Sequence, residues 1–280
     1  MKISIIIPAY NAEKTIKRAV ESCKSFKKNL SEIIVIDDCS TDNTFNVLKK
    51  LELELDNIKI FKNNTNKGVS YSRNFGVNMS SGEYCIFLDS DDYYLGNAGV
   101  VVHNEISRSE YDVYCFGYII NGKSSPKPNV ERKLYLEFFD KKFSNTNTIV
   151  SSKAVLEANK FREDFKIGED TDLWFRLLCK CKSKYVDKNI AYYDYCPKIN
   201  DVDEHPVLKL SLYEVNIPEL EKTYIRNKVT NSLLLRGVFS RRLSIKKSFQ
   251  HLGMKGVIFW LGGEYLFSVA WKFKHGIKNA

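Results

Sequence analysis

Three carboxylates stand within four residues at the end of an apolar run. The run at 84–88 has the composition of a buried strand, and Asp89, Asp91 and Asp92 follow it directly. Because adjacent negative charges repel one another, such a cluster must be solvated, paired with cations or bound to a metal ion. Clusters of carboxylate oxygens suit Mg²⁺ or Mn²⁺ that is shared with a phosphate group. A solvated turn after a strand is the alternative that this stretch alone leaves open.

Polar residues follow two other predicted strands in the same way. The apolar run at 3–7 is broken by Pro8-Ala9-Tyr10-Asn11, and the run at 33–36 stops at Asp37-Asp38. Helices are predicted between the strands from apolar residues at helical spacing, over 16–23, 44–55 and 70–80. This alternation predicts a parallel sheet with helices on both faces. Ligands of such sheets bind at the carboxyl ends of the strands, so we expect one acidic cleft that holds a metal ion and a polar ligand.

The second half of the chain is less regular and contains one more acidic pair. Glu169-Asp170 precedes apolar residues at helical spacing between 173 and 181. Acidic side chains in a first helical turn are favoured by the helix dipole, so this pair has a structural explanation as well as a functional one. We also predict a strand at 113–116 and a hairpin at 185–195.

The composition is that of a globular protein. Hydrophobic residues make up 44% of the 280 residues and aromatic residues 13%, which is enough for a full core. We expect no signal peptide and no transmembrane helix, because the first apolar run is short and no apolar run reaches the length of a span. The seven cysteines lack the paired spacing of zinc or redox motifs, so we expect reduced thiols in a cytosolic protein.

The net charge of +9 is unevenly distributed along the chain. From Lys222 to Ala280 there are 12 Lys and Arg residues and a single acid, Glu264, whereas residues 1–221 carry 31 basic and 33 acidic residues. The basic C-terminal part therefore predicts an anionic partner. Tryptophans beside lysines in this part suit a helix on an anionic membrane face, and packing on the body or in a homodimer is the alternative. A nucleic-acid partner is not expected, because no recognition motif accompanies the charge.

Five segments, in order along the chain, resemble the motifs of the family 2 glycosyltransferases. Members of that family are inverting enzymes of the GT-A fold that use nucleotide sugars. The five segments in order are specific, although each is weak alone. They are SIIIPAYNAE at 4–13, IIVIDDCSTDNT at 33–44, NKGVSYSRNFG at 66–76, GEYCIFLDSDD at 82–92 and GEDTDLWFRL at 168–177.

The resemblance implies an α/β protein of the GT-A fold. Its Rossmann-like sheet would be mixed, mainly parallel and flanked by helices, within a catalytic domain at 1–205, and a helical, basic extension would follow at 206–280. The implied function is transfer of a hexose or N-acetylhexosamine from a UDP-sugar to a hydroxyl of a growing surface or lipid-linked glycan, as in bacterial polysaccharide or lipooligosaccharide synthesis. Such an enzyme would be cytoplasmic, with the inner face of the plasma membrane as its place of peripheral attachment.

The resemblance also implies roles for single residues. Asp91 and Asp89 would hold Mn²⁺ or Mg²⁺, with Asp92 behind them or on the acceptor side. Asp170 would be the base that takes the proton from the attacking hydroxyl, and Glu169 would orient it or contact the acceptor. The nucleotide sugar would contact a larger set, namely Pro8, Tyr10, Glu13, Asp37, Asp38, Arg73, Asp89 and Ser90. A purely structural role for the arginine, as a counter-ion, stays open.

One departure from the family pattern concerns the metal site. Many members carry a histidine after the last hairpin, and the stretch 195–201 has none. His205 is the nearest, and a surface loop is the favoured explanation for it.

Two alternatives to a UDP-sugar transferase are weighed. One is a catalytically inactive relative that acts as a binding subunit, and the intact Asp89, Asp91 and Asp170 argue against it. The other is a nucleotidyltransferase, and the lack of a glycine-rich phosphate loop after Ile7 argues against that.

Overall fold

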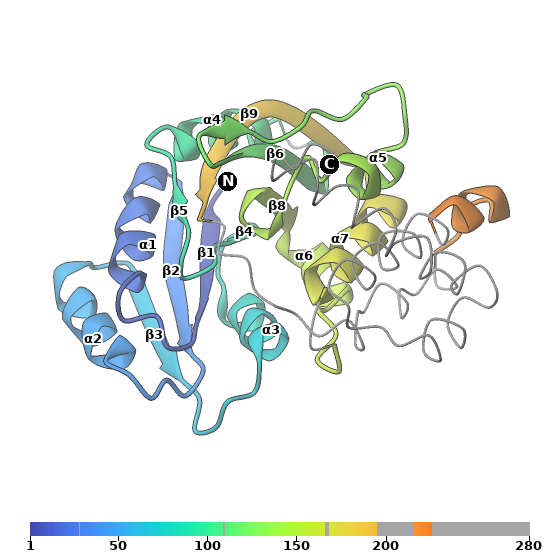
Figure 1. Ribbon diagram of the computed structural model, residues 1–280. Coiled ribbons are helices and arrows are strands. Elements are labelled where there is room, and N and C mark those ends of the chain that lie inside the picture. Colours follow the sequence, from blue (N-terminus) through green and yellow to red (C-terminus); the bar gives the residue numbers. More distant parts are fainter. Residues whose placement is uncertain (28, 109, 166–167, 195–214, 226–280) are drawn as a thin grey trace, which may run out of the picture. The chain divides into compact units, whose positions relative to one another are not determined.

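The computed structural model describes residues 1–27, 29–108, 110–165, 168–194 and 215–225 (Figure 1). These residues fall into two units. The larger holds the described part of 1–197 together with 215–216, and the smaller holds 217–225, where a helix runs over 219–225. The expected boundary at residue 205 and most of the basic extension lie outside the described residues, so both stay predictions. Among the residues that are described, no helix combines the length and the apolar character needed to cross a bilayer.

Nine strands of the larger unit form one mixed sheet within the described residues. Four are parallel in the order β3-β2-β1-β4, with bounds Ile58–Lys62, Leu30–Asp37, Ile3–Ala9 and Tyr84–Phe87. The sheet continues as β8-β6-β9-β5, with β7 paired to β6, and the bounds of these strands are Ile149–Ser152, Val113–Ile120, Ser183–Tyr193, Tyr93–Tyr94 and Lys123–Ser124. The parallel sheet predicted for the first 90 residues is confirmed, and it is part of the mixed sheet that was expected.

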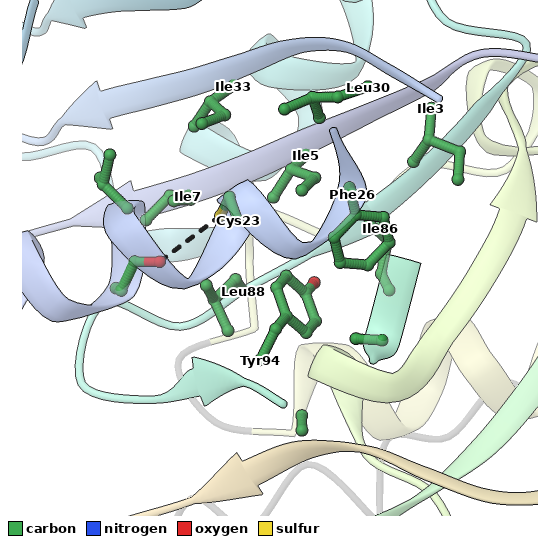
Figure 2. Packing of buried hydrophobic residues seen from close by; sticks show 14 of the residues in the cluster. Ile3, Ile5, Ile7, Cys23, Phe26, Leu30, Ile33, Ile86, Leu88 and Tyr94 are labelled. Atoms are coloured by element: carbon green, nitrogen blue, oxygen red, sulfur yellow. Dashed lines mark hydrogen bonds between the residues drawn. The ribbon is translucent and has the colours of Figure 1, made fainter. Parts of the chain in front are cut away.

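Helices cover both faces of β1 and β2 (Figure 1). On one face lie α1 (Ile16–Ser22), the 3₁₀ turn η1 (Cys23–Phe26) and α2 (Thr44–Glu54), and on the other lies α3 (Val69–Met79). Side chains alternate between the faces of a strand. Figure 2 shows the odd-numbered isoleucines of β1, Ile3, Ile5 and Ile7, packed with Cys23 and Phe26 of η1. Ile6 lies on the other face, against Gly76 of α3.

The remaining helices pack around the second half of the sheet. They are α4 (Ala98–Ile106), α5 (Leu134–Lys141), the 3₁₀ turn η2 (Thr146–Thr148), α6 (Lys153–Ala158) and α7 (Glu169–Lys180). The six described cysteines form no disulfide, and Cys196 lies outside the described part of the chain.

The hairpin predicted at 185–195 is wrong, because β9 runs through this segment as a single strand. Val186 pairs with Phe116 and Asn189 with Gly117, so that Asp187 and Lys188 bulge out of the parallel pairing with β6, and a second register shift follows between Gly117 and Tyr118. Two adjacent charged residues are typical of a turn. A bulge suits them equally well, because its residues also leave the hydrogen-bonded ladder and face solvent.

Gly76 allows α3 to lie directly on β1. A Cβ at this position would be 2.4 Å from Cγ2 of Ile6 and 3.1 Å from Cδ1 of Ile36, and both isoleucines are fully buried. We expect Gly76→Ala to lower the free energy of unfolding by about 2 kcal/mol, because overpacking forces buried side chains off their rotamers. Urea denaturation followed by circular dichroism measures this loss. Gly96→Ala is the control, since a Cβ there meets no atom within 4 Å, and an equal loss in both variants would contradict the close packing of α3.

Candidate active site

The acidic segments that follow the first strands meet at one edge of the sheet. β1, β2 and β4 are parallel, so their carboxyl ends share that edge. The backbone N–H of Asp38 donates to the carbonyl of Ala9 at 2.8 Å, and the N–H of Leu88 donates to the carbonyl of Ile6 at 3.0 Å. The convergence predicted from the strand ends is therefore confirmed for the segments that begin at Asp37 and Asp89.

Arg73 connects the end of β4 to the start of α7. It projects from α3 and is 4% exposed. Its Nη2 donates to Oδ1 of Asp89 and its Nη1 donates to Oε1 of Glu169, both at 2.8 Å. The guanidinium carbon lies 5.2 Å from the ring centroid of Phe161, which adds a cation–π contact. One buried cation thus joins two acidic segments that are far apart in the sequence.

The charges around Arg73 are not balanced. Burial opposes the charge on Arg73, but the carboxylates of Asp89, Glu169 and Asp170 outweigh it and raise the pKa of the guanidinium. Burial and the adjacent charge of Asp170 raise the pKa of Glu169, although Arg73 acts in the opposite direction. Three carboxylates around one guanidinium leave an excess of negative charge, which favours the binding of a cation.

The loop that contains Asp89 and Asp92 is held at both ends. The side-chain oxygen of Asn147 accepts from the Asp89 N–H at 2.8 Å, and its amide nitrogen donates to Oδ2 of Asp92. The N–H of Asp194, just after β9, donates to the other oxygen of Asp92 at 2.7 Å. Burial, together with the charges of Asp89 and Asp91, raises the pKa of Asp92 to about 7, against the effect of these hydrogen bonds.

Asp89 and Asp91 are the carboxylates that best fit a metal ion. The side chain of Asp89 is 33% exposed and Asp91 is half-buried, whereas Asp92 is fully enclosed by protein. In the described part of the chain, no group of three or more His, Cys, Asp or Glu side chains is arranged to hold a metal. Mg²⁺ commonly uses one or two carboxylates and completes its shell with ligand phosphates and water, so two carboxylates fit it. A cation here would also relieve the repulsion of Asp92 by the charges of Asp89 and Asp91. His205, the nearest histidine in the sequence, lies outside the described residues.

Asp170 is held in one orientation in the first turn of α7. The hydroxyl of Thr146 donates to its Oδ2 at 3.1 Å, and the N–H of Thr171 donates to its Oδ1 at 2.6 Å. The indole N–H of Trp174 donates in turn to the Thr146 hydroxyl at 3.2 Å. Asp170 follows Glu169 directly in the chain, and its negative charge contributes to the raised pKa values of Arg73 and Glu169.

Asp38 organises the loop that leads into α3. One of its oxygens accepts from the side chain of Asn63 at 2.7 Å and from the N–H of Lys67 at 2.9 Å, and the other accepts from the N–H of Gly68 at 2.7 Å. A carboxylate has about four acceptor positions, so these three hydrogen bonds fill most of them. Asp38 is 4% exposed, so protein encloses it almost completely.

The other predicted nucleotide contacts occupy different environments. Tyr10 is 49% exposed beside the buried Pro8. Asp37 is fully buried and accepts a hydrogen bond from the N–H of Ser40 at 3.1 Å, so its role is structural. Glu13 accepts from the N–H of Asn43 at 3.0 Å and so binds the start of α2. Ser90 is half-buried in the acidic loop, and the nucleotide contacts of all these residues stay predictions.

Sequence reasoning missed several residues that shape the site. Thr146 and Asn147 lie in a segment without any recognised motif, within the polar run 144–148 between Phe143 and Ile149, and no feature of that run distinguishes them. Arg18 of α1 was also missed: it donates to the backbone carbonyl of Asp91 and to Oδ2 of Asp194, and it lies over the ring of Tyr93.

Removing the charge of Arg73 should destabilise the fold. We expect Arg73→Met to lower the free energy of unfolding by about 3 kcal/mol, because Glu169 would then be a buried charge without its partner. Arg18→Met is the matched control, since the side chain of Arg18 is 44% exposed and an exposed ion pair contributes about 1 kcal/mol or less. Urea denaturation of both variants measures the difference, and equal losses would show that the bridge between Asp89 and Glu169 is not a stabilising contact.

The comparisons with known proteins agree with one another. The family model described as Glycosyl transferase family 2 matches residues 4–164. A GalNAc(5)-diNAcBac-PP-undecaprenol beta-1,3-glucosyltransferase of Campylobacter jejuni is 32% identical over 204 residues, which cover 69% of this chain and 64% of the relative. A poly(ribitol-phosphate) beta-glucosyltransferase of Bacillus spizizenii is 30% identical over 203 residues, which cover 69% of this chain and 32% of the relative. The chain thus spans less than two thirds of the length of either relative.

A solved structure shows the same fold. The crystal structure of Staphylococcus aureus TarS 1-349 in complex with UDP-GlcNAc has a TM-score of 0.67 at 23% sequence identity, covering 94% of this chain and 79% of the other. This likeness confirms the α/β architecture of the GT-A type that was predicted for the chain.

Proposed function

This chain belongs to glycosyl transferase family 2, and on that premise we propose that it is an inverting glycosyltransferase. It moves a hexose or N-acetylhexosamine from a UDP-sugar to a hydroxyl of a growing surface or lipid-linked glycan. The observation that carries the proposal is the pair of hydrogen bonds by which Arg73 joins Asp89 to Glu169. They bring the acids of the leaving-group side beside the acids of the acceptor side, as transfer requires.

The carboxylates on the two sides have different tasks. Asp89 and Asp91 would hold Mn²⁺ or Mg²⁺. When bound, the ion stabilises the negative charge that develops on the departing UDP. Asp170 accepts the proton of the attacking hydroxyl while the new glycosidic bond forms and the sugar–phosphate bond breaks. Glu169, fixed by Arg73, orients Asp170 or contacts the acceptor.

The nucleoside is bound at the ends of β1 and β2. Tyr10 is exposed there, and Asp38 is the proposed acceptor for the N–H of a uracil edge. Pro8 and Ser90 line the same edge, while Asp37 and Glu13 support it through the contacts they make with neighbouring loops.

The acceptor is proposed to be a phosphate-bearing glycan. The names of the two relatives contain PP-undecaprenol and poly(ribitol-phosphate), and both are anionic. The basic residues between 222 and 280 would attract such an acceptor or an anionic membrane surface. On this proposal the protein works at the cytoplasmic face of the plasma membrane, and a homodimer formed through the same segment is the alternative use of these residues.

An assay with purified protein tests the proposal. The protein is incubated with UDP-glucose, UDP-galactose, UDP-GlcNAc and UDP-GalNAc in the presence of Mn²⁺, and UDP release and transfer to a diphosphate-linked glycolipid are measured. Calorimetry with UDP, with and without Mn²⁺, measures binding separately. Binding without turnover for any donor would favour an inactive binding subunit, release of pyrophosphate from UTP and a sugar phosphate would favour a nucleotidyltransferase, and no UDP binding would overturn the proposal.

A further inference from the structure

The turn η2 is a buried part of the fold that reaches both acidic segments of the site. Its three residues are 3%, 1% and 0% exposed. The turn is closed by the N–H of Thr148, which donates to the carbonyl of Asn145 at 2.9 Å. Ser144, just before it, donates to the carbonyl of Phe116 on β6 at 2.9 Å. The turn is therefore fixed to the sheet.

The hydrogen-bond partners of Asn147 allow its side-chain amide only one orientation. The Asp89 N–H can only donate, so it fixes the amide oxygen at Asp89 and directs the NH₂ group to Asp92. The two anchored residues flank Asp91. Asn147 therefore fixes the path of the loop from which the Asp91 carboxylate projects.

The hydroxyl of Thr146 is oriented in the same way. The indole N–H of Trp174 can only donate, so the hydroxyl oxygen accepts this hydrogen bond and its own hydrogen points to Oδ2 of Asp170. Because the N–H of Thr171 holds the other oxygen, the carboxylate of Asp170 cannot rotate without losing a hydrogen bond.

From these contacts we propose that Thr146 and Asn147 are positioning residues of the transfer reaction. The inference rests on the proposed function, because it concerns the alignment of the same site. Two adjacent residues of one buried turn hold the base Asp170 and the loop that carries Asp91 at a fixed separation. The acceptor hydroxyl and the sugar–phosphate bond must be aligned between these two groups, and a displacement of about 1 Å can cost as much as a hundredfold in rate.

Substitution of Thr146 tests its effect on the base. Thr146→Val keeps the shape of the side chain and removes the hydrogen bond to Asp170. We expect kcat to fall about tenfold, while the Kd for UDP with Mn²⁺, measured by calorimetry, stays unchanged. Thr146→Ser keeps the hydroxyl and should restore kcat.

Substitution of Asn147 tests its effect on the loop. Asn147→Leu keeps the volume and removes both hydrogen bonds, so we expect the Kd for UDP with Mn²⁺ to rise about tenfold. The Mn²⁺ concentration for half-maximal activity should rise with it. Where the leucine variant does not fold, Asn147→Ala gives the same test.

A third variant separates positioning from general packing. Ser4→Ala removes a buried hydrogen bond to Glu32 near the start of β1, at the opposite end of the strand from the acidic site, so only its melting temperature should fall. The inference is overturned if Thr146→Val and Asn147→Leu lower the melting temperature alone, or if Ser4→Ala changes kcat and Kd as they do. If the unmodified protein neither binds UDP nor transfers sugar, the proposed function fails and the inference fails with it. If the unmodified protein is active and the Thr146 and Asn147 variants behave as it does, the inference fails and the proposed function stands.

Discussion

Asp91→Ala is expected to lower the rate of sugar transfer by about 10³-fold, which corresponds to roughly 4 kcal/mol of transition-state stabilisation. The carboxylate is proposed to hold the cation that takes up the charge of the departing UDP, and the adjacent Asp92 cannot replace it, because Asp92 is fully buried and already hydrogen-bonded on both oxygens. The fold should persist, because Arg18 donates to the backbone carbonyl of residue 91, which alanine also has.

Two measurements check this expectation. UDP release with Mn²⁺ gives the rate, and calorimetry should show that Mn²⁺ no longer strengthens UDP binding. Asp187→Ala is the control, because Asp187 is an exposed aspartate paired only with Lys127 among the contacts described for it. Transfer at the unmodified rate by the Asp91 variant would remove this residue from the metal site.

Asp170→Asn should lower kcat by about 10³-fold and leave the binding of UDP with Mn²⁺ unchanged. The asparagine has nearly the same shape, and its side-chain oxygen can still accept from Thr146. It cannot take a proton from the acceptor hydroxyl, however, so the chemical step loses its base. Binding should be retained because Asp170 is proposed to act on the acceptor, and among its described contacts it makes no hydrogen bond to Asp89.

A neighbouring aspartate on the same helix provides the contrast. Asp172 is fully buried and accepts from Nε of Arg176 at 2.9 Å, so it is a structural residue of α7. Asp172→Asn should therefore lower the melting temperature and leave kcat of the folded protein close to normal. Single-turnover kinetics of both variants measures the chemical step directly. A normal rate for the Asp170 variant would place the base elsewhere.

The parts of the site that follow strands could be predicted from the sequence. Asp37-Asp38 and Asp89 come directly after continuous apolar runs, and parallel strands end at the same edge of a sheet, so their convergence follows from the pattern alone. The pairing of Arg73 with Glu169 could not be derived in this way. It depends on how α3 and α7 approach each other, and no local pattern encodes that approach.

Sequence reasoning missed Thr146 and Asn147 for a different reason. In a sequence, small polar residues such as Thr146 and Asn147 indicate a solvated loop. Here both are buried, because the hydroxyl of Thr146 and the side-chain amide of Asn147 are hydrogen-bonded to other protein groups. The wrong hairpin has a related origin. The sequence of 185–195 predicts a hairpin, and only the register of β9 against β6 shows that Asp187 and Lys188 form a bulge within a single strand.

The outer position of β3 has a consequence for self-association. This strand forms one border of the sheet among the described residues, is five residues long, and includes Lys59 and Lys62. A short border strand with lysines resists the addition of a strand from another molecule, which is the usual start of fibrillar aggregation. Any oligomer of this protein should therefore assemble through surfaces other than this border, and sheet extension from one copy to the next is disfavoured there.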